Sequence, residues 1–136
     1  MASDWHWPRI IPLASVMGMI FFLSHQDGGT LGKLSLPAIP HIDKAAHFVM
    51  YGTLAAAALY ALPASLLRRY PHRTAWAIIV SCLVYGITDE VHQGFIAGRD
   101  TSISDLAADF LGAAFVVLLW CRKQMKSLPF PVFAGR

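Results

Sequence analysis

The sequence predicts an all-α integral membrane protein, a four-helix bundle formed by a single domain over residues 1–136. The first observation is composition: 56% of the residues are hydrophobic and only 14% are charged, with a mean hydropathy of +0.51. A soluble domain normally carries about 25% charged residues to cover its surface. The second is four long apolar stretches, since a membrane span needs roughly 20 mainly apolar residues. A soluble helical domain is the alternative that this composition disfavours.

The expected spans cover about residues 8–24, 44–62, 74–93 and 104–121. Before the first span, Trp5 and Trp7 precede Arg9, a pattern typical of an interfacial anchor. No small-residue cleavage site follows this span, so we expect it to stay in the mature protein rather than act as a signal peptide. The glycine- and proline-rich stretch 25–42 is predicted to be a loop, either a lid or a plain surface loop.

The second helix is expected to begin at Asp43, a plausible N-cap after Pro40, and to end at Pro63. Within it, Gly52 and Ala56 form a small-residue pair that permits close approach of another helix.

The third helix should continue through the acidic residues after Thr88 and stop at Gly94. Ser102 or Ser104 could cap the fourth helix, and Gly112 would be a site of close helix contact on it. The tail 123–136 is expected to be disordered.

Charge is segregated along the predicted topology. With four spans, the side that carries the termini holds eight of the eleven Lys and Arg residues, so both termini are expected in the cytoplasm. Seven of the eight acidic residues fall on the opposite side, the exception being Asp4. The cations sit at helix ends, where membrane proteins usually carry them, so nucleic acid is not an expected partner.

A dense polar segment over residues 88–112 lies between apolar stretches. An ionised side chain inside a membrane costs about 3 kcal/mol on insertion scales, and such residues face a bundle interior or a wet cavity. We therefore predict an outward-facing polar pocket. Its expected catalytic residues are His47, Asp89, Glu90, Gln93, Asp105 and Asp109. Its expected substrate-binding residues are Ser24, Gln26, Asp43, Lys44, Tyr51 and Arg99.

Three chemistries fit this set. Carboxylates beside a histidine can carry out general acid-base catalysis. A lysine and an arginine at the mouth suit a phosphate or carboxylate group. The oxygen ligands of a divalent cation cofactor could come from Asp89, Glu90, Asp105 and Asp109.

Each residue also has a structural interpretation. Asp43 could serve only as a cap, Asp105 could pair with a helix dipole, and Arg99 could form a buried ion pair that fixes a loop.

Three motifs, in the same order and spacing, resemble the VanZ-like family. They are Asp43-Lys44-x-x-His47-Phe48-x-x-Tyr51-Gly52, Asp89-Glu90-x-x-Gln93-x-Phe95-x-x-Gly98-Arg99 and Asp105-Leu106-x-x-Asp109-x-x-Gly112. The Ser24-x-Gln26 end of the first span is similar to that family too. Two residues depart from the pattern: Asp109 stands where many members have asparagine, and Ala97 replaces a proline.

The resemblance implies a small polytopic membrane protein linked to glycopeptide (teicoplanin-type) resistance, without a settled reaction. The expected location is the bacterial inner membrane, with the motif side facing outward and the lipid bilayer as the first partner. We expect the protein to act on or bind a lipid-linked or anionic envelope component, an envelope precursor or a glycopeptide. The alternative is a non-catalytic membrane protein that shields a ligand or stabilises a partner. An ion-coupled transporter is a third class, disfavoured by the lack of an inverted repeat.

Overall fold

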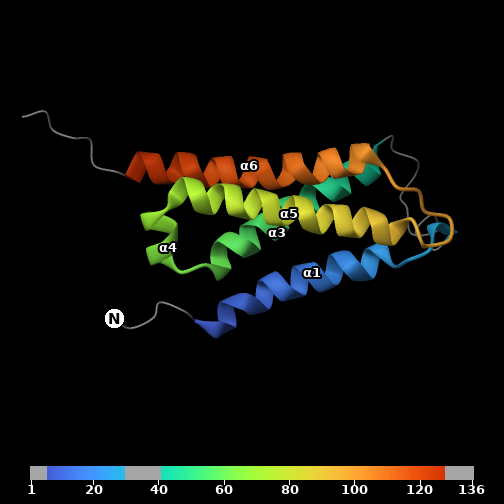
Figure 1. Ribbon diagram of the computed structural model, residues 1–136, viewed down its shortest axis with the longest axis horizontal. Helices are drawn as coiled ribbons and strands as arrows, with labels where there is room; N and C mark the ends of the chain where they lie inside the picture. Colours follow the sequence, from blue (N-terminus) through green and yellow to red (C-terminus); the bar gives the residue numbers. More distant parts are fainter. Residues whose placement is uncertain (1–5, 30–40, 128–136) are drawn as a thin grey trace, which may run out of the picture.

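The computed structural model describes residues 6–29 and 41–127, and the regular elements within these ranges are all helical (Figure 1). Four helices are long, which confirms the predicted helical bundle. They are α1 (Ile10–Ser24), α3 (Ile42–Ala61), α5 (Pro71–Gln93) and α6 (Ile103–Ser127). Two short elements accompany them: a 3-10 turn, η1 (Trp7–Arg9), and a helix, α4 (Ala64–Arg69), which occupies the turn expected before α5.

Three helical segments are long and apolar enough to cross a membrane, judged by length and composition: Trp7–Ser24, Pro71–Gln93 and Ile103–Gln124. The helix α3 is not among them. Its first two turns carry Asp43, Lys44 and His47, and much of the remainder is alanine, which is only weakly hydrophobic. The polar residues that define the motif therefore lower the hydropathy of the helix that bears them.

The helix α3 lies at the centre of the bundle and contacts α6, α1 and α5. Its packing is closest against α6, where Gly52 faces Gly112. A Cβ atom at Gly112 would collide with the carbonyl oxygen of Phe48, so only glycine permits this approach. The buried core continues from this contact through Tyr51 and Val117. The α3–α6 pair is thus the tightest unit of the fold.

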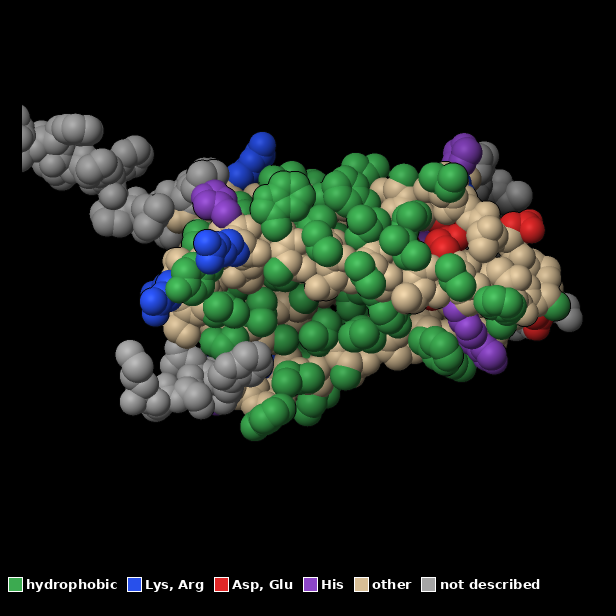
Figure 2. Space-filling model, viewed as in Figure 1, with side chains coloured by type: hydrophobic (Ala, Val, Ile, Leu, Met, Phe, Trp, Pro, Cys, Tyr) green, Lys and Arg blue, Asp and Glu red, His purple; other side chains and the backbone are tan. Residues whose placement is uncertain are grey.

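On the face shown in Figure 2, hydrophobic side chains cover much of the surface between the two ends of the bundle. Large side chains such as Phe22, Trp76 and Leu118 are each about 60% exposed, which suits contact with lipid. Lys and Arg side chains gather at one end in this view, whereas Asp and Glu side chains gather at the other. The basic end is formed by α4 and the start of α5, with Arg68, Arg69 and Arg73.

Several expected boundaries change. The N-cap of α3 is His41, with a left-handed φ of 64°, so Asp43 lies in the first turn and is not the cap. The helix α6 continues to Ser127, so the first residues of the expected tail are helical. Residues 30–40 of the expected loop and 128–136 of the tail lie outside the described residues. The helix α5 ends at Gln93 and is followed by Gly94, as predicted.

Candidate functional site

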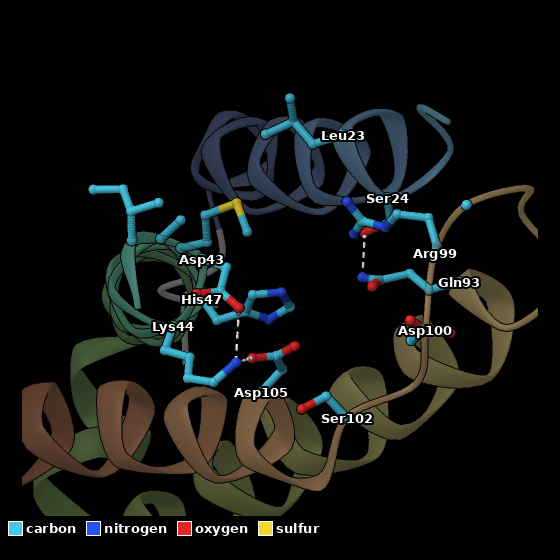
Figure 3. A pocket seen from close by; sticks show the side chains of 14 residues that line it. Leu23, Ser24, Asp43, Lys44, His47, Gln93, Arg99, Asp100, Ser102 and Asp105 are labelled. Atoms are coloured by element: carbon cyan, nitrogen blue, oxygen red, sulfur yellow. Dashed lines mark hydrogen bonds and ion pairs between the residues drawn. The ribbon is translucent and has the colours of Figure 1, made fainter. Parts of the chain in front are cut away.

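The acidic end of the bundle contains a cavity of about 620 Å³ (Figure 3). It lies where the last turns of α1 and α5 meet the first turns of α3 and α6, beside the loop 94–102. The polar and charged side chains that line it are Ser24, Asp43, Lys44, His47, Gln93, Arg99, Asp100, Ser102 and Asp105. The cavity therefore opens at the end of the bundle that holds the sequence motifs.

A buried imidazole–carboxylate pair links α3 to α6. The Nδ1–H of His47 donates to Oδ1 of Asp109 over 2.9 Å, and the two side chains are 8% and 0% exposed. The other carboxylate oxygen, Oδ2, has no partner among the described residues. A Cβ atom at Gly86 would lie 2.9 Å from Oδ2, so the glycine on α5 makes room for this carboxylate. The second ring nitrogen of His47, Nε2, is not used in this pair.

A second ion pair lies at the cavity mouth. The ammonium of Lys44 is 2.7 Å from Oδ2 of Asp43 and 2.7 Å from Oδ1 of Asp105. Asp105 is nearly buried, whereas Asp43 is exposed. The hydrogen bond from Lys44 holds the pKa of Asp43 below its usual range, so this carboxylate stays ionised. Lys44 thus joins the exposed rim to the buried wall.

Glu90 on α5 is held by the loop that follows it. Its Oε2 accepts a hydrogen bond of 2.7 Å from the backbone N–H of Ser102. Its Oε1 is buried and has no partner within the described part of the chain. Ser102 was predicted as a possible helix cap; it directly precedes α6, and its carbonyl accepts from the N–H of Leu106 over 3.2 Å, while its hydroxyl contacts Ser104. The sequence gives no indication of the hydrogen bond from the Ser102 amide to Glu90, because any residue except proline can supply a backbone N–H.

The amide of Gln93 connects α5 to α1. Its Nε2 donates to Oγ of Ser24 over 3.2 Å and to Oδ2 of Asp89 over 3.1 Å, and all three side chains are buried. The contact between Gln93 and Asp89 follows from their spacing of one helical turn. The contact with Ser24 places the end of α1 against the site.

Arg99 comes from the loop 94–102, and its side chain points across the cavity (Figure 3). Within residues 6–29 and 41–127 it forms no ion pair. Gly98 before it has a φ of +73°, a conformation that favours glycine. The carbonyl of Ala97 accepts a bond of 3.2 Å from the N–H of Gly28. The loop is therefore attached to the segment after α1, and it presents a cation to the cavity.

Five expected site residues fall outside the cavity lining, two of them expected to bind substrate and three expected to be catalytic. Gln26 follows α1 and folds back onto its end, where the side-chain amide donates to the carbonyl of Phe22 over 2.9 Å. Tyr51 is fully buried below His47, with ring centroids 6.5 Å apart, and its hydroxyl has no partner among the described residues. The expected catalytic residues Asp89, Glu90 and Asp109 are buried and do not line the cavity. Their roles remain predictions.

Asp100 lines the cavity, although its position in the sequence gave no reason to expect it there. A contact between two histidines at the same end was also not expected: the ring nitrogens of His25 and His92 are 3.2 Å apart. Both rings stack near Phe21. No local spacing connects His25 with His92, because they lie 67 residues apart.

Among the described residues, one group of His, Asp and Glu side chains lies close enough together to be a candidate metal site. A ligand atom from each of His47, Glu90 and Asp105 lies within 4.8 Å of the other two, and all three residues are buried. The sequence suggested a different set, with Asp89 and Asp109 in place of the histidine. In the structure Asp89 contacts Gln93, and Asp109 contacts His47 through Oδ1.

These features define a class: a multi-pass α-helical membrane protein with buried polar groups at one end of the bundle. The family model for VanZ/LLP1 matches residues 7–124, which is most of the chain. The chain therefore belongs to the VanZ/LLP1 family, which confirms the resemblance seen in the motifs. Comparison with curated proteins and with solved structures gave no match.

Proposed function

We propose that this VanZ/LLP1 protein acts on a lipid-linked or anionic component of the bacterial cell envelope, bound in the cavity at the acidic end. The observation that carries the proposal is the meeting of Arg99 and His47 in one cavity. Arg99 forms no ion pair within the described ranges, so its planar guanidinium is available to a phosphate or carboxylate group. The imidazole lies on the opposite wall, on α3.

The buried groups behind the wall would provide proton transfer. Asp109 fixes the orientation of the His47 ring and stabilises its protonated form, as a carboxylate does in other acid-base pairs. Glu90, which is held through Oε2 by Ser102, keeps Oε1 without a partner in the described structure and is the second acid-base candidate. Asp89 and Gln93 would position these groups, and Lys44 would complete the anion site.

Charge supports the proposed location. The Arg side chains of α4 and α5 lie at the end of the bundle away from the cavity (Figure 2). Positive residues near span ends favour the cytoplasm, so the proposal places the cavity on the outer side of the inner membrane. An anionic envelope precursor or a glycopeptide such as teicoplanin would reach it there.

The test is a teicoplanin-susceptibility assay in bacteria that express the protein. Glu90→Ala and Arg99→Ala should each abolish any protection, while membrane levels stay equal to wild type by quantitative blotting. Thr101→Ala, an exposed change next to the site, should leave protection intact. Full protection by both site variants would rule out the proposed chemistry.

A second candidate is a binding or accessory protein without turnover. It is favoured by the pairing of the polar groups with each other, Gln93 with Asp89 and Lys44 with Asp105, which suggests a network built for shape. Asp89→Asn and Glu90→Gln separate the two functions because they keep size and most hydrogen bonds. An enzyme should lose nearly all activity in these variants, whereas a binding protein should keep much of it.

A further inference from the structure

We propose that His47, Glu90 and Asp105 form a binding site for a divalent transition-metal cation of the Zn²⁺ or Mn²⁺ kind. The three residues come from α3, α5 and α6, so the site would connect three helices at a single point. Their ligand atoms lie within 4.8 Å of one another. Ligands of a tetrahedral zinc site are about 3.4 Å apart, so small side-chain rotations would close the site.

The surroundings of Glu90 are an independent indication that this site takes a ligand. The residue is only 7% exposed, and its Oε1 has no hydrogen-bond partner among the described residues. Leaving a buried carboxylate oxygen without a partner is costly, and native structures rarely do so without a reason. The N–H of Ser102 holds the other oxygen, so the carboxylate cannot turn freely away. A cation would satisfy Oε1 where it stands.

The histidine is arranged as a metal ligand. Histidines that bind metals usually donate their second ring N–H to a carboxylate, which fixes the ring and raises its basicity. His47 makes this contact through Nδ1 to Oδ1 of Asp109. Its Nε2 is then the free nitrogen, with a lone pair to offer. The Asp109 carboxylate therefore holds Nδ1 of His47, and Nε2 on the other side of the ring can bind the metal.

Lys44 is the residue whose ion pair would change when a metal cation binds. Its ammonium pairs with Oδ1 of Asp105, so it supplies positive charge beside the proposed metal site. A bound cation would take the second oxygen of Asp105 or displace the ammonium. Lys44 has an alternative partner in Asp43, also at 2.7 Å, so its charge would not be left unpaired. The metal cation can therefore replace the Lys44 ammonium at Asp105.

The ligand set also limits the metal. Mg²⁺ and Ca²⁺ prefer sites made only of oxygen, whereas an imidazole with carboxylates suits first-row transition metals. Three protein ligands would leave a coordination position open towards the cavity, as in catalytic zinc sites. There the cation could polarise an oxygen of an anionic ligand. Binding of the cation itself does not depend on the function proposed above.

The test is a titration of the full-length protein, purified in lipid nanodiscs and treated with a chelator that is then removed. ZnCl₂ is added and the heat of binding is measured, with Mn²⁺ electron paramagnetic resonance as a second readout. We expect saturable binding at one site per chain. His47→Gln and Glu90→Gln should each weaken it by about tenfold or more. Glu90→Gln retains an oxygen that can accept from Ser102, so this variant should stay folded.

The control is the double variant His25→Asn and His92→Asn, which removes the other pair of neighbouring imidazoles at this end. It should bind Zn²⁺ with unchanged affinity. Absence of saturable binding by the wild-type protein would overturn the proposal. So would binding that disappears in the control but persists in His47→Gln and Glu90→Gln. The heat of binding reports the metal alone, so loss of protection in the teicoplanin assay is a separate result.

Discussion

His47 and Asp109 form a buried hydrogen bond of 2.9 Å between two helices whose residues lie 62 positions apart in the chain. The backbones of the same two helices approach each other closely at Gly112 and Phe48, where a Cβ atom on the glycine would collide with a carbonyl oxygen. The polar pair and the glycine contact are adjacent on α6, three residues apart. The orientation of the imidazole in the candidate site therefore depends on the packing of α3 against α6.

Asp109→Ala should destabilise the protein by about 3–5 kcal/mol, because it leaves the buried imidazole of His47 without its carboxylate. Asp109→Asn should cost less, since its amide oxygen can still accept from Nδ1–H. Unfolding in detergent, followed by tryptophan fluorescence, measures the difference. Asp100→Ala is the control, because Asp100 is exposed and its loss should change stability by less than about 0.5 kcal/mol. Equal stability of Asp109→Ala and wild type would contradict the buried pair.

Gly112→Ala should destabilise the bundle by about 1–3 kcal/mol, the usual cost of overpacking. The added methyl group would meet the carbonyl of Phe48, which belongs to a helix backbone and cannot rotate away. Gly18→Ala on α1 is the matched control, because a Cβ there meets nothing within 4 Å. That change should be neutral or stabilising by roughly 0.5–1 kcal/mol through helix propensity. The same unfolding assay compares them, and similar effects of the two changes would refute the close contact.

Glu90→Ala should release the loop 94–102, because it removes the carboxylate that accepts from the amide of Ser102. Hydrogen exchange followed by mass spectrometry should show faster exchange in peptides that contain Ser102. Glu90→Gln should keep most of the protection, since its side-chain oxygen can accept the same bond. Unchanged exchange in Glu90→Ala would mean that the loop is fixed by other contacts, such as that between Gly28 and Ala97.

The proposed orientation predicts a labelling pattern in intact cells. In a background without Cys82 and Cys121, a membrane-impermeant maleimide should label Thr101→Cys, at the cavity end, from outside. Arg68→Cys, at the basic end, should be labelled only after the membrane is opened. Both positions are exposed in the bundle, so burial does not account for a difference. The reverse pattern would place the cavity on the cytoplasmic side.

The helices and the family motifs could be predicted from the sequence because they depend on local patterns. Apolar length predicted the long helices, and helical spacing predicted the contact of Asp89 with Gln93. Rotation of a helix about its axis is harder to predict, because it depends on neighbours that are distant in sequence. Gly52 does contact α6, but Ala56, from the same small-residue pattern, is exposed.

The pairing of the site residues is the part that the sequence did not determine. The sequence predicted that His47, Glu90 and Asp109 lie at one end of the bundle, and in the structure they lie there and are buried. The choice of partners depended on the register between α3, α5 and α6. A cap was expected at Asp43, but the chain turns earlier, at His41, and this frees the carboxylate for Lys44. Contacts made by a backbone N–H, such as that of Ser102 with Glu90, cannot be predicted from the type of the residue that donates.

The polar contact between Gln93 and Ser24 also bears on how the protein is made. These residues are 69 positions apart, and α1 has only Ile20 and Ser24 fully buried. During synthesis α1 therefore enters the bilayer long before the side chain that will hold its end has left the ribosome. Until then the Ser24 hydroxyl must be solvated by water or lipid headgroups. The hydrogen bond that holds the end of α1 can therefore form only after α5 has been made.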